Sequence, residues 1–183
     1  MQATTVINSL AVLENVGKLL SYPGADYLAE VRACRNAASA IDPEAARYLD
    51  DFCARLGGLS VEDAQELYVQ TFDLNPICAL EVGWQLYGDN YDRGNFLVKM
   101  CQELDRYGVP ETAELPDHLG NMLPLLARME PAEARSMSAS GVIPAVKKML
   151  AAFEGKDNPY ATLLNALGRI LEVREAAPEA NHA

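Results

Sequence analysis

Histidine and paired cysteines are scarce in this 183-residue sequence. It has two histidines, His118 and His182, and no His-x-x-x-His pair of the kind that binds zinc from one helix face. Its four cysteines, at positions 34, 53, 78 and 101, form no C-x-x-C motif. We therefore predict no metal site and expect the cysteines to be buried free thiols.

Basic residues are also in the minority. Fifteen Lys and Arg stand against 26 Asp and Glu, which gives a net charge of −11. Nucleic acid is therefore excluded as a partner, because its phosphates must be neutralised by basic side chains. The sequence also has no Gly-rich phosphate loop and no G-x-S-x-G motif. The acidity fits either a cationic partner or solubility alone.

Long apolar runs are absent as well. No stretch approaches the ~18 residues needed to cross a bilayer, so we expect no membrane insertion. The N-terminus has no basic residues before its apolar stretch, and Glu14 interrupts that stretch, unlike a secretory signal. We predict a cytoplasmic protein.

Helical periodicity runs through the sequence, and strand alternation does not. We predict an all-α, single-domain bundle of roughly eight to ten helices over residues 1–175, with a disordered tail at 176–183. Asp42-Pro43 and Ser60 are typical helix starts. Two apolar faces are expected in the core, made by Val142, Val146, Met149 and Phe153 and by Tyr160, Leu163, Leu164, Leu167 and Leu171.

Two segments invite closer attention. The stretch ICALEVGWQLYG (residues 77–88) is apolar almost all round, which predicts a helix in the middle of the bundle. The second contains Pro116-Asp117-His118, from which a helix is expected to run toward Met129, kinked or split by Pro124.

Pro116-Asp117-His118 allows four interpretations: a catalytic dyad, a metal ligand with its orienting residue, a helix start, or part of a binding surface. Adjacent helical side chains diverge by about 100°, which disfavours a dyad, and nothing in the spacing pairs His118 with Cys78 as a nucleophile. We favour a helix start with Pro116 at the first position and Asp117 in the first turn. The positive helix end would then keep His118 neutral.

An aromatic stripe lies between these features. Tyr68 and Phe72 are four residues apart, and Trp84 and Tyr87 are three apart. Such a stripe is typical of core packing. It would equally suit a groove in which aromatic side chains bind the apolar face of a peptide helix while nearby acids attract its basic residues. The acids in question are Asp73, Glu81, Asp89 and Asp92.

Three motifs in order, LLSYP, LYVQTFDLNPICALEVGWQLYGDNYDRG and ELPDHL, resemble the respiratory nitrate reductase delta subunit, the NarJ-type assembly chaperones within the wider TorD/DmsD-like group of redox-enzyme maturation proteins. The resemblance implies an all-helical protein that is not an enzyme and binds no cofactor stably. Its expected partner is the catalytic subunit of a molybdoenzyme, bound through the N-terminal segment. That subunit would stay competent to receive molybdenum-bis(pyranopterin guanine dinucleotide) and an iron–sulfur cluster.

The resemblance also implies which positions bind the client. These are Tyr68, Phe72, Asp73, Tyr87, Asp92, Arg93, Leu115, Pro116, Asp117 and His118. The aromatic and acidic stripe described above adds Glu81 and Trp84. A helical adaptor for a different peptide and an enzyme acting on the cofactor are the alternatives. A homodimer formed by swapping is open too, with residues 89–93 and 108–115 as candidate hinges.

Overall fold

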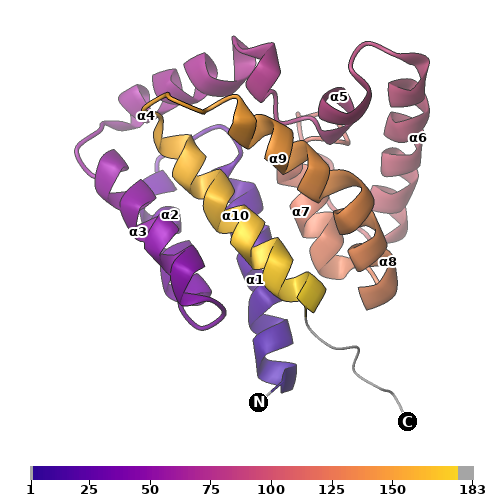
Figure 1. The fold of residues 1–183 in the computed structure, drawn as a ribbon, viewed down its shortest axis with the longest axis horizontal. Coiled ribbons are helices and arrows are strands. Elements are labelled where there is room, and N and C mark those ends of the chain that lie inside the picture. The colour runs from indigo at the N-terminus through magenta and orange to yellow at the C-terminus, as the bar shows by residue number, and fades with distance from the viewer. Residues whose placement is uncertain (1, 177–183) are drawn as a thin grey trace.

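The structure is a computed structural model that describes the backbone of residues 2–176 and the side chains of residues 10–176. Of the predicted disordered tail at 176–183, Ala176 is helical, so the prediction was wrong there, and the rest of the tail lies outside the described residues. The helices run along the chain as α1 Gln2–Leu19, α2 Tyr27–Ala38, α3 Pro43–Leu56, α4 Val61–Tyr68, α5 Val82–Tyr87, α6 Tyr91–Arg106, α7 Leu119–Arg128, α8 Pro131–Met137, α9 Ile143–Ala151 and α10 Pro159–Ala176 (Figure 1). This confirms the predicted all-α bundle.

Short helical turns of other kinds separate some of these helices. A π-helical turn, Val69–Asp73, follows α4, and a second, Ser138–Val142, joins α8 to α9. A 3-10 turn, Pro76–Cys78, precedes α5. Extended pairing within the described part of the chain is limited to one isolated bridge between Glu81 and His118.

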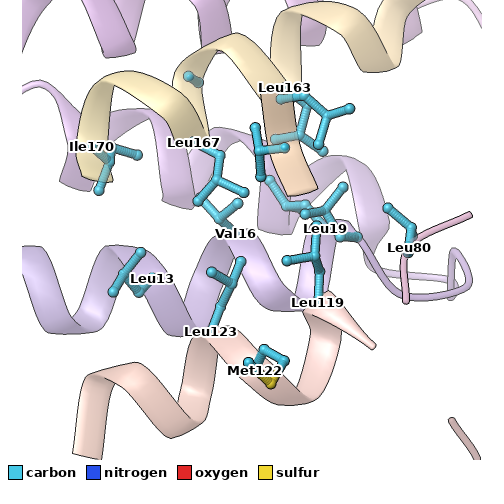
Figure 2. Packing of buried hydrophobic residues seen from close by; sticks show 14 of the residues in the cluster. Leu13, Val16, Leu19, Leu80, Leu119, Met122, Leu123, Leu163, Leu167 and Ile170 are labelled. Atoms are coloured by element: carbon cyan, nitrogen blue, oxygen red, sulfur yellow. The ribbon is translucent and has the colours of Figure 1, made fainter. Parts of the chain in front are cut away.

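Helix α1 passes between α10 and α7, and the core forms around it. Figure 2 shows Leu13, Val16 and Leu19 of α1 facing side chains from both neighbours. These are Leu163, Leu167 and Ile170 of α10 and Leu119, Met122 and Leu123 of α7, all buried. Helices α2 and α3 close the other side, with α3 packed along α10. Both apolar faces predicted near the C-terminus are confirmed as core.

The predicted helix starts at Asp42 and Ser60 are confirmed. The Asp42 carboxylate accepts a hydrogen bond from the Ala45 N–H at 2.8 Å. Ser60 and Asp63 each accept a hydrogen bond from the other's backbone N–H, which closes a capping box. Local side-chain chemistry therefore determines where α3 and α4 begin.

The apolar segment at residues 77–88 does not form one central helix, so that prediction was wrong. The chain makes a 3-10 turn, has extended backbone at Ala79 and Glu81 with a bend at Leu80 between them, and only then begins α5 at Val82. A short apolar run that is buried on most sides can be either non-helical or helical, and the spacing of its apolar residues does not distinguish the two. Tyr87, at the end of α5, is 41% exposed.

The helix after Pro116 also differs from the prediction. It begins at Leu119, with His118 as its N-cap, so Pro116 and Asp117 precede the helix. Pro124 lies inside α7 without splitting it. The cysteines are free thiols as expected, but only Cys34 and Cys78 are buried, while Cys53 is half-buried and Cys101 is exposed on α6. None of the helices in residues 2–176 combines the length and apolar character needed to span a bilayer.

Candidate functional site

The segment before α5 and the segment before α7 pair through two backbone hydrogen bonds. The Val82 N–H donates to the Asp117 carbonyl at 2.8 Å, and the Leu119 N–H donates to the Leu80 carbonyl at 3.0 Å. These bonds satisfy backbone groups that neither helix could satisfy internally. This pairing holds the N-terminal ends of the two helices next to each other.

Asp117 caps α5 from the other segment. It is fully buried, and its Oδ2 accepts a hydrogen bond from the Gly83 N–H at 2.9 Å. Glu81, the residue at the N-cap position of α5, makes no side-chain cap of its own. Burial raises the pKa of Asp117, while the Gly83 N–H and the nearby Arg93 oppose that rise. Asp117 is therefore part of the internal architecture and not of the accessible surface.

His118 caps α7. Its Nδ1 accepts a hydrogen bond from the Gly120 N–H at 3.0 Å, so the proton of the neutral ring is on Nε2. Burial lowers the pKa of His118 to about 4, in agreement with the neutral form predicted from the sequence. The ring lines a pocket, and within the described residues Nε2 has no hydrogen-bond partner. His118 can therefore donate one hydrogen bond to a bound group.

That pocket, which we call the acidic pocket, has a volume of about 230 Å³. Its walls come from α4, the π-helical turn after it, α5, α6 and the loop before α7. The lining residues are Tyr68, Phe72, Asp73, Pro76, Ala79, Leu80, Glu81, Trp84, Arg93, Glu114 and His118. A pocket of this size accommodates a single side chain and not a whole helix.

Three carboxylates set the charge of the acidic pocket. Asp73 and Glu114 are exposed, and Glu81 is half-buried. Partial burial raises the pKa of Asp73, and it raises that of Glu114 together with the charges of Asp73 and Glu81. Carboxylates that repel one another in this way favour a bound cation, which would relieve the repulsion.

Arg93 is the basic residue of the pocket, and it is directed at a ring. Its guanidinium lies 5.3 Å from the centroid of the Trp84 ring, in a cation–π contact. The Trp84 Nε1–H donates to the Pro76 carbonyl at 2.8 Å, which fixes the indole. The carboxylates of the pocket therefore remain available to a ligand.

Tyr68 and Phe72 form the inner wall of the pocket and also belong to the core. Both are buried, and their ring centroids lie 5.2 Å apart. Phe72 in turn packs edge-on against Tyr160 of α10 at 4.7 Å. Truncating either ring would open a cavity in the core, so neither is suitable for testing ligand binding by substitution.

The structure brings together part of the predicted set. Seven of the twelve residues line the acidic pocket: Tyr68, Phe72, Asp73, Glu81, Trp84, Arg93 and His118. Tyr87 and Asp92 line a separate groove of about 730 Å³. Pro116 lines a third hollow, of about 280 Å³, and Leu115 is exposed. Asp117 lies buried behind the pocket.

Sequence reasoning missed Glu114. Glu114 is the first residue of the ELPDHL motif, but only the fold shows that it lines the same pocket as Asp73 and Glu81. Four large apolar side chains near these lining segments are exposed as well: Tyr22, Leu74, Ile77 and Leu115. Tyr22 packs edge-on against Tyr68. An acidic pocket with apolar neighbours suits a segment that carries a basic residue flanked by apolar ones.

No cluster of three or more His, Cys, Asp or Glu side chains within the described chain could hold a metal ion.

Comparisons with known proteins agree with the resemblance. A sequence profile of the family described as "Nitrate reductase delta subunit" matches residues 37–166. The nitrate reductase molybdenum cofactor assembly chaperone NarJ of Escherichia coli K12 is 28% identical over 156 residues, 83% of this chain and 66% of the relative. The chain thus spans about two thirds of that relative.

Two further relatives carry similar names. The probable nitrate reductase molybdenum cofactor assembly chaperone NarJ of Bacillus subtilis is 31% identical over 170 residues, 90% of this chain and 92% of the relative. The probable chaperone NarW of Escherichia coli K12 is 25% identical over 159 residues. These relatives are named as assembly chaperones and not as catalysts. The chain belongs to the nitrate reductase delta subunit family.

Proposed function

We propose that this protein is a cytoplasmic assembly chaperone for the catalytic subunit of a respiratory molybdoenzyme, with nitrate reductase as the first candidate client. Family membership supports the chaperone role. The client subunit would be held without its cofactor until molybdenum-bis(pyranopterin guanine dinucleotide) and an iron–sulfur cluster are inserted, and would then be released to the membrane complex.

The acidic pocket is the proposed contact for the client's N-terminal segment. A basic side chain of that segment would enter between Asp73, Glu81 and Glu114, and its aliphatic stem would lie against Trp84. Exposed apolar side chains such as Leu74 and Ile77 would contact the flanking residues of the segment. Apolar burial contributes roughly 25 cal/mol per Å², and the carboxylates accelerate encounter with a basic partner.

The clustering of three carboxylates around one small pocket is the observation that carries this assignment. No energy-driven cycle is required. The client segment would leave the chaperone once it forms more favourable contacts within the mature enzyme, because its affinity for the chaperone differs between the cofactor-free and the mature client.

Affinity capture tests the proposal. The full chain is used as bait in the native cytoplasm under anaerobic, nitrate-respiring growth, and the captured proteins are identified by mass spectrometry. We expect a molybdoenzyme catalytic subunit, enriched in its cofactor-free form. The double variant Asp73→Asn/Glu114→Gln should capture much less of it, whereas Glu62→Gln/Glu154→Gln removes the same charge from exposed positions outside the pocket and should not.

Capture of a membrane or signalling protein in place of a molybdoenzyme would contradict the chaperone assignment and favour a helical adaptor. Equal capture by both double variants would leave the chaperone role intact and refute the pocket.

A further inference from the structure

Five buried side-chain nitrogen and oxygen atoms in the described part of the chain lack a hydrogen bond. Three of them belong to residues with a neighbour of opposite charge. Arg169 Nε lies 3.1 Å from a Glu44 carboxylate oxygen, and the charges of Arg93 and Asp117 attract each other. Burying a polar atom without a partner costs free energy. The remaining two atoms have no such compensation.

These two atoms, Ser138 Oγ and Arg174 Nη1, belong to residues that line one small cavity. The cavity lies where the C-terminal end of α10 meets α7, α8 and the π-helical turn after α8 (Figure 1). We call it the α8–α10 cavity. Its lining residues are Leu126, Ala134, Arg135, Ser138, Arg174 and Glu175. None of them lines the acidic pocket.

The α8–α10 cavity has the size of one very small ligand. Its volume is about 10 Å³, close to the least that holds a single water-sized species. Ser138 is only 4% exposed. The Ser138 hydroxyl and the Arg174 guanidinium do not hydrogen-bond to each other. A species placed between them would therefore contact both.

The charges around the cavity favour an anion. Two guanidinium groups, those of Arg135 and Arg174, line it together with one carboxylate, that of Glu175. Burial lowers the pKa of Arg174, Glu175 opposes that shift, and the charge of Arg135 adds to it. A guanidinium nevertheless keeps its charge in proteins. The cavity therefore has an excess of positive charge, although the chain has a net charge of −11.

We propose that the α8–α10 cavity binds a single small monovalent anion of about the size of chloride. The Arg174 Nη1–H and the Ser138 O–H would donate hydrogen bonds to it, and Arg135 would contribute its charge. Water would accept the same two hydrogen bonds but would leave the charge of Arg174 uncompensated. Sulfate and phosphate are too large for this volume. The bound anion would hold the end of α10 to the π-helical turn.

Thermal unfolding of the full chain in matched salts tests the proposal. Sodium chloride replaces sodium gluconate stepwise at constant ionic strength, because gluconate is too large for the cavity. Chloride at ten times its dissociation constant would multiply the ratio of folded to unfolded protein about elevenfold. The melting temperature of the wild-type chain should therefore rise by about 3–6 °C. Saturation of this rise would indicate a single site.

Arg174→Gln removes the cation that the anion compensates. In gluconate this variant should be at least as stable as the wild type, because a buried charge without a partner is gone. In chloride the wild type should be the more stable of the two. A purely structural role of Arg174 would not reverse the order between the salts. Arg32→Gln removes the same charge from an exposed position on α2 and should keep the full chloride-dependent rise.

Ser138→Ala removes only the hydroxyl. Alanine is a good helix former and fits the space of serine, so the variant should fold. Loss of one hydrogen bond to a charged ligand should weaken chloride binding about tenfold. The chloride-dependent rise in melting temperature should then fall to less than half of the wild-type value.

Chloride-35 NMR observes the ion itself. Exchange between bulk solution and a protein site broadens the bulk chloride resonance. We expect broadening with the wild-type chain and with Arg32→Gln, and much less with Arg174→Gln. Added bromide, which is similar in size and charge, should reverse the broadening by competing for the site.

Two results would overturn the proposal. Equal melting temperatures of the wild type in chloride and in gluconate would mean that the cavity takes only water. An equal chloride-dependent rise in the wild type and in Arg174→Gln would mean that the ion binds elsewhere. Neither result bears on the acidic pocket, because neither Arg174 nor Ser138 lines it.

Discussion

The Asp117 carboxylate accepts a hydrogen bond from the backbone N–H of Gly83 at 2.9 Å, across 34 residues of sequence. This bond fixes α5, a six-residue helix too short to be stable alone. Helix α5 is also held from its other end, where Lys148 Nζ donates to the Gln85 carbonyl at 2.6 Å. The positions of Glu81 and Trp84 in the acidic pocket, and of Leu86 and Tyr87 in the separate groove of about 730 Å³, depend on this helix.

Removing the Asp117 cap should destabilise the protein. Asp117→Ala leaves the Gly83 N–H buried without an acceptor, which we expect to lower the free energy of unfolding by about 1–3 kcal/mol. Asp117→Asn keeps an acceptor oxygen and should lose less. Urea unfolding followed by circular dichroism measures both. Equal stability of wild type and Asp117→Ala would show that the hydrogen bond contributes nothing.

Gly83 has no room for a side chain. A Cβ there would lie 2.6 Å from Asp117 Oδ2 and 2.9 Å from Phe96 Cδ1. Gly83→Ala should therefore displace both neighbours and cost about 1–3 kcal/mol of stability. Gly94→Ala is the matched control, because a Cβ at that position in α6 meets nothing within 4 Å. It should be stabilising by up to about 1 kcal/mol. Equal melting temperatures for the two variants would refute the packing argument.

His118 should make stability depend on pH in a defined direction. Its folded-state pKa of about 4 lies below the ordinary value of 6.5, because burial disfavours the charged ring. The unfolded chain therefore binds the proton more readily. The stabilisation is complete above about pH 6.5 and is lost as the pH falls toward 4, by an amount of the order of 3 kcal/mol.

His118→Asn isolates this contribution. Asparagine can accept the Gly120 N–H bond at the N-cap but does not titrate. The wild-type chain should lose stability relative to His118→Asn between pH 6.5 and 4, whereas the raised pKa values of Asp117 and Glu114 are common to both proteins. A difference between the two unfolding curves that does not change with pH would contradict a buried neutral histidine.

Charge repulsion in the acidic pocket is measurable directly. The pKa of Glu114 is raised by partial burial first and then by Asp73 and Glu81. Glu81→Gln removes one of these charges, so the Glu114 pKa should fall but stay above its ordinary value. Carboxyl-carbon NMR titration measures the shift, with Glu62→Gln as the control outside the pocket. An unchanged Glu114 pKa would mean that the two carboxylates do not interact.

Local signals in the sequence predicted much of the fold. Asp42 and Ser60 start their helices through hydrogen bonds to residues three positions away, and such partners are visible in the sequence. The regular apolar faces near the C-terminus are buried as the periodicity indicated. Each of these features depends on neighbours within one or two helical turns.

The start of α7 and the shape of the site were not predictable in the same way. Residues 79–81 are not helical because Leu80 and Val82 form backbone hydrogen bonds with residues 117–119, which the sequence does not show. The same long-range pairing places the Asp117 side chain in the interior and leaves His118 as the N-cap of α7. The residues predicted to form one groove are divided between two hollows: Trp84 and Arg93 line the acidic pocket, whereas Tyr87 and Asp92 line a separate groove.

The most direct test of the account is a double-mutant cycle between the acidic pocket and one basic residue of a client's N-terminal peptide. Calorimetry would give the affinity of the peptide, and of the same peptide with that Lys or Arg replaced by Gln, for wild type and for Asp73→Asn/Glu114→Gln. We predict that the wild-type chain binds the basic peptide about three- to tenfold more tightly than the Gln peptide. The variant with the neutralised pocket should bind the two peptides equally. If the losses of binding free energy caused by the peptide change and by the protein change were additive, a direct contact between the pocket and that residue would be contradicted.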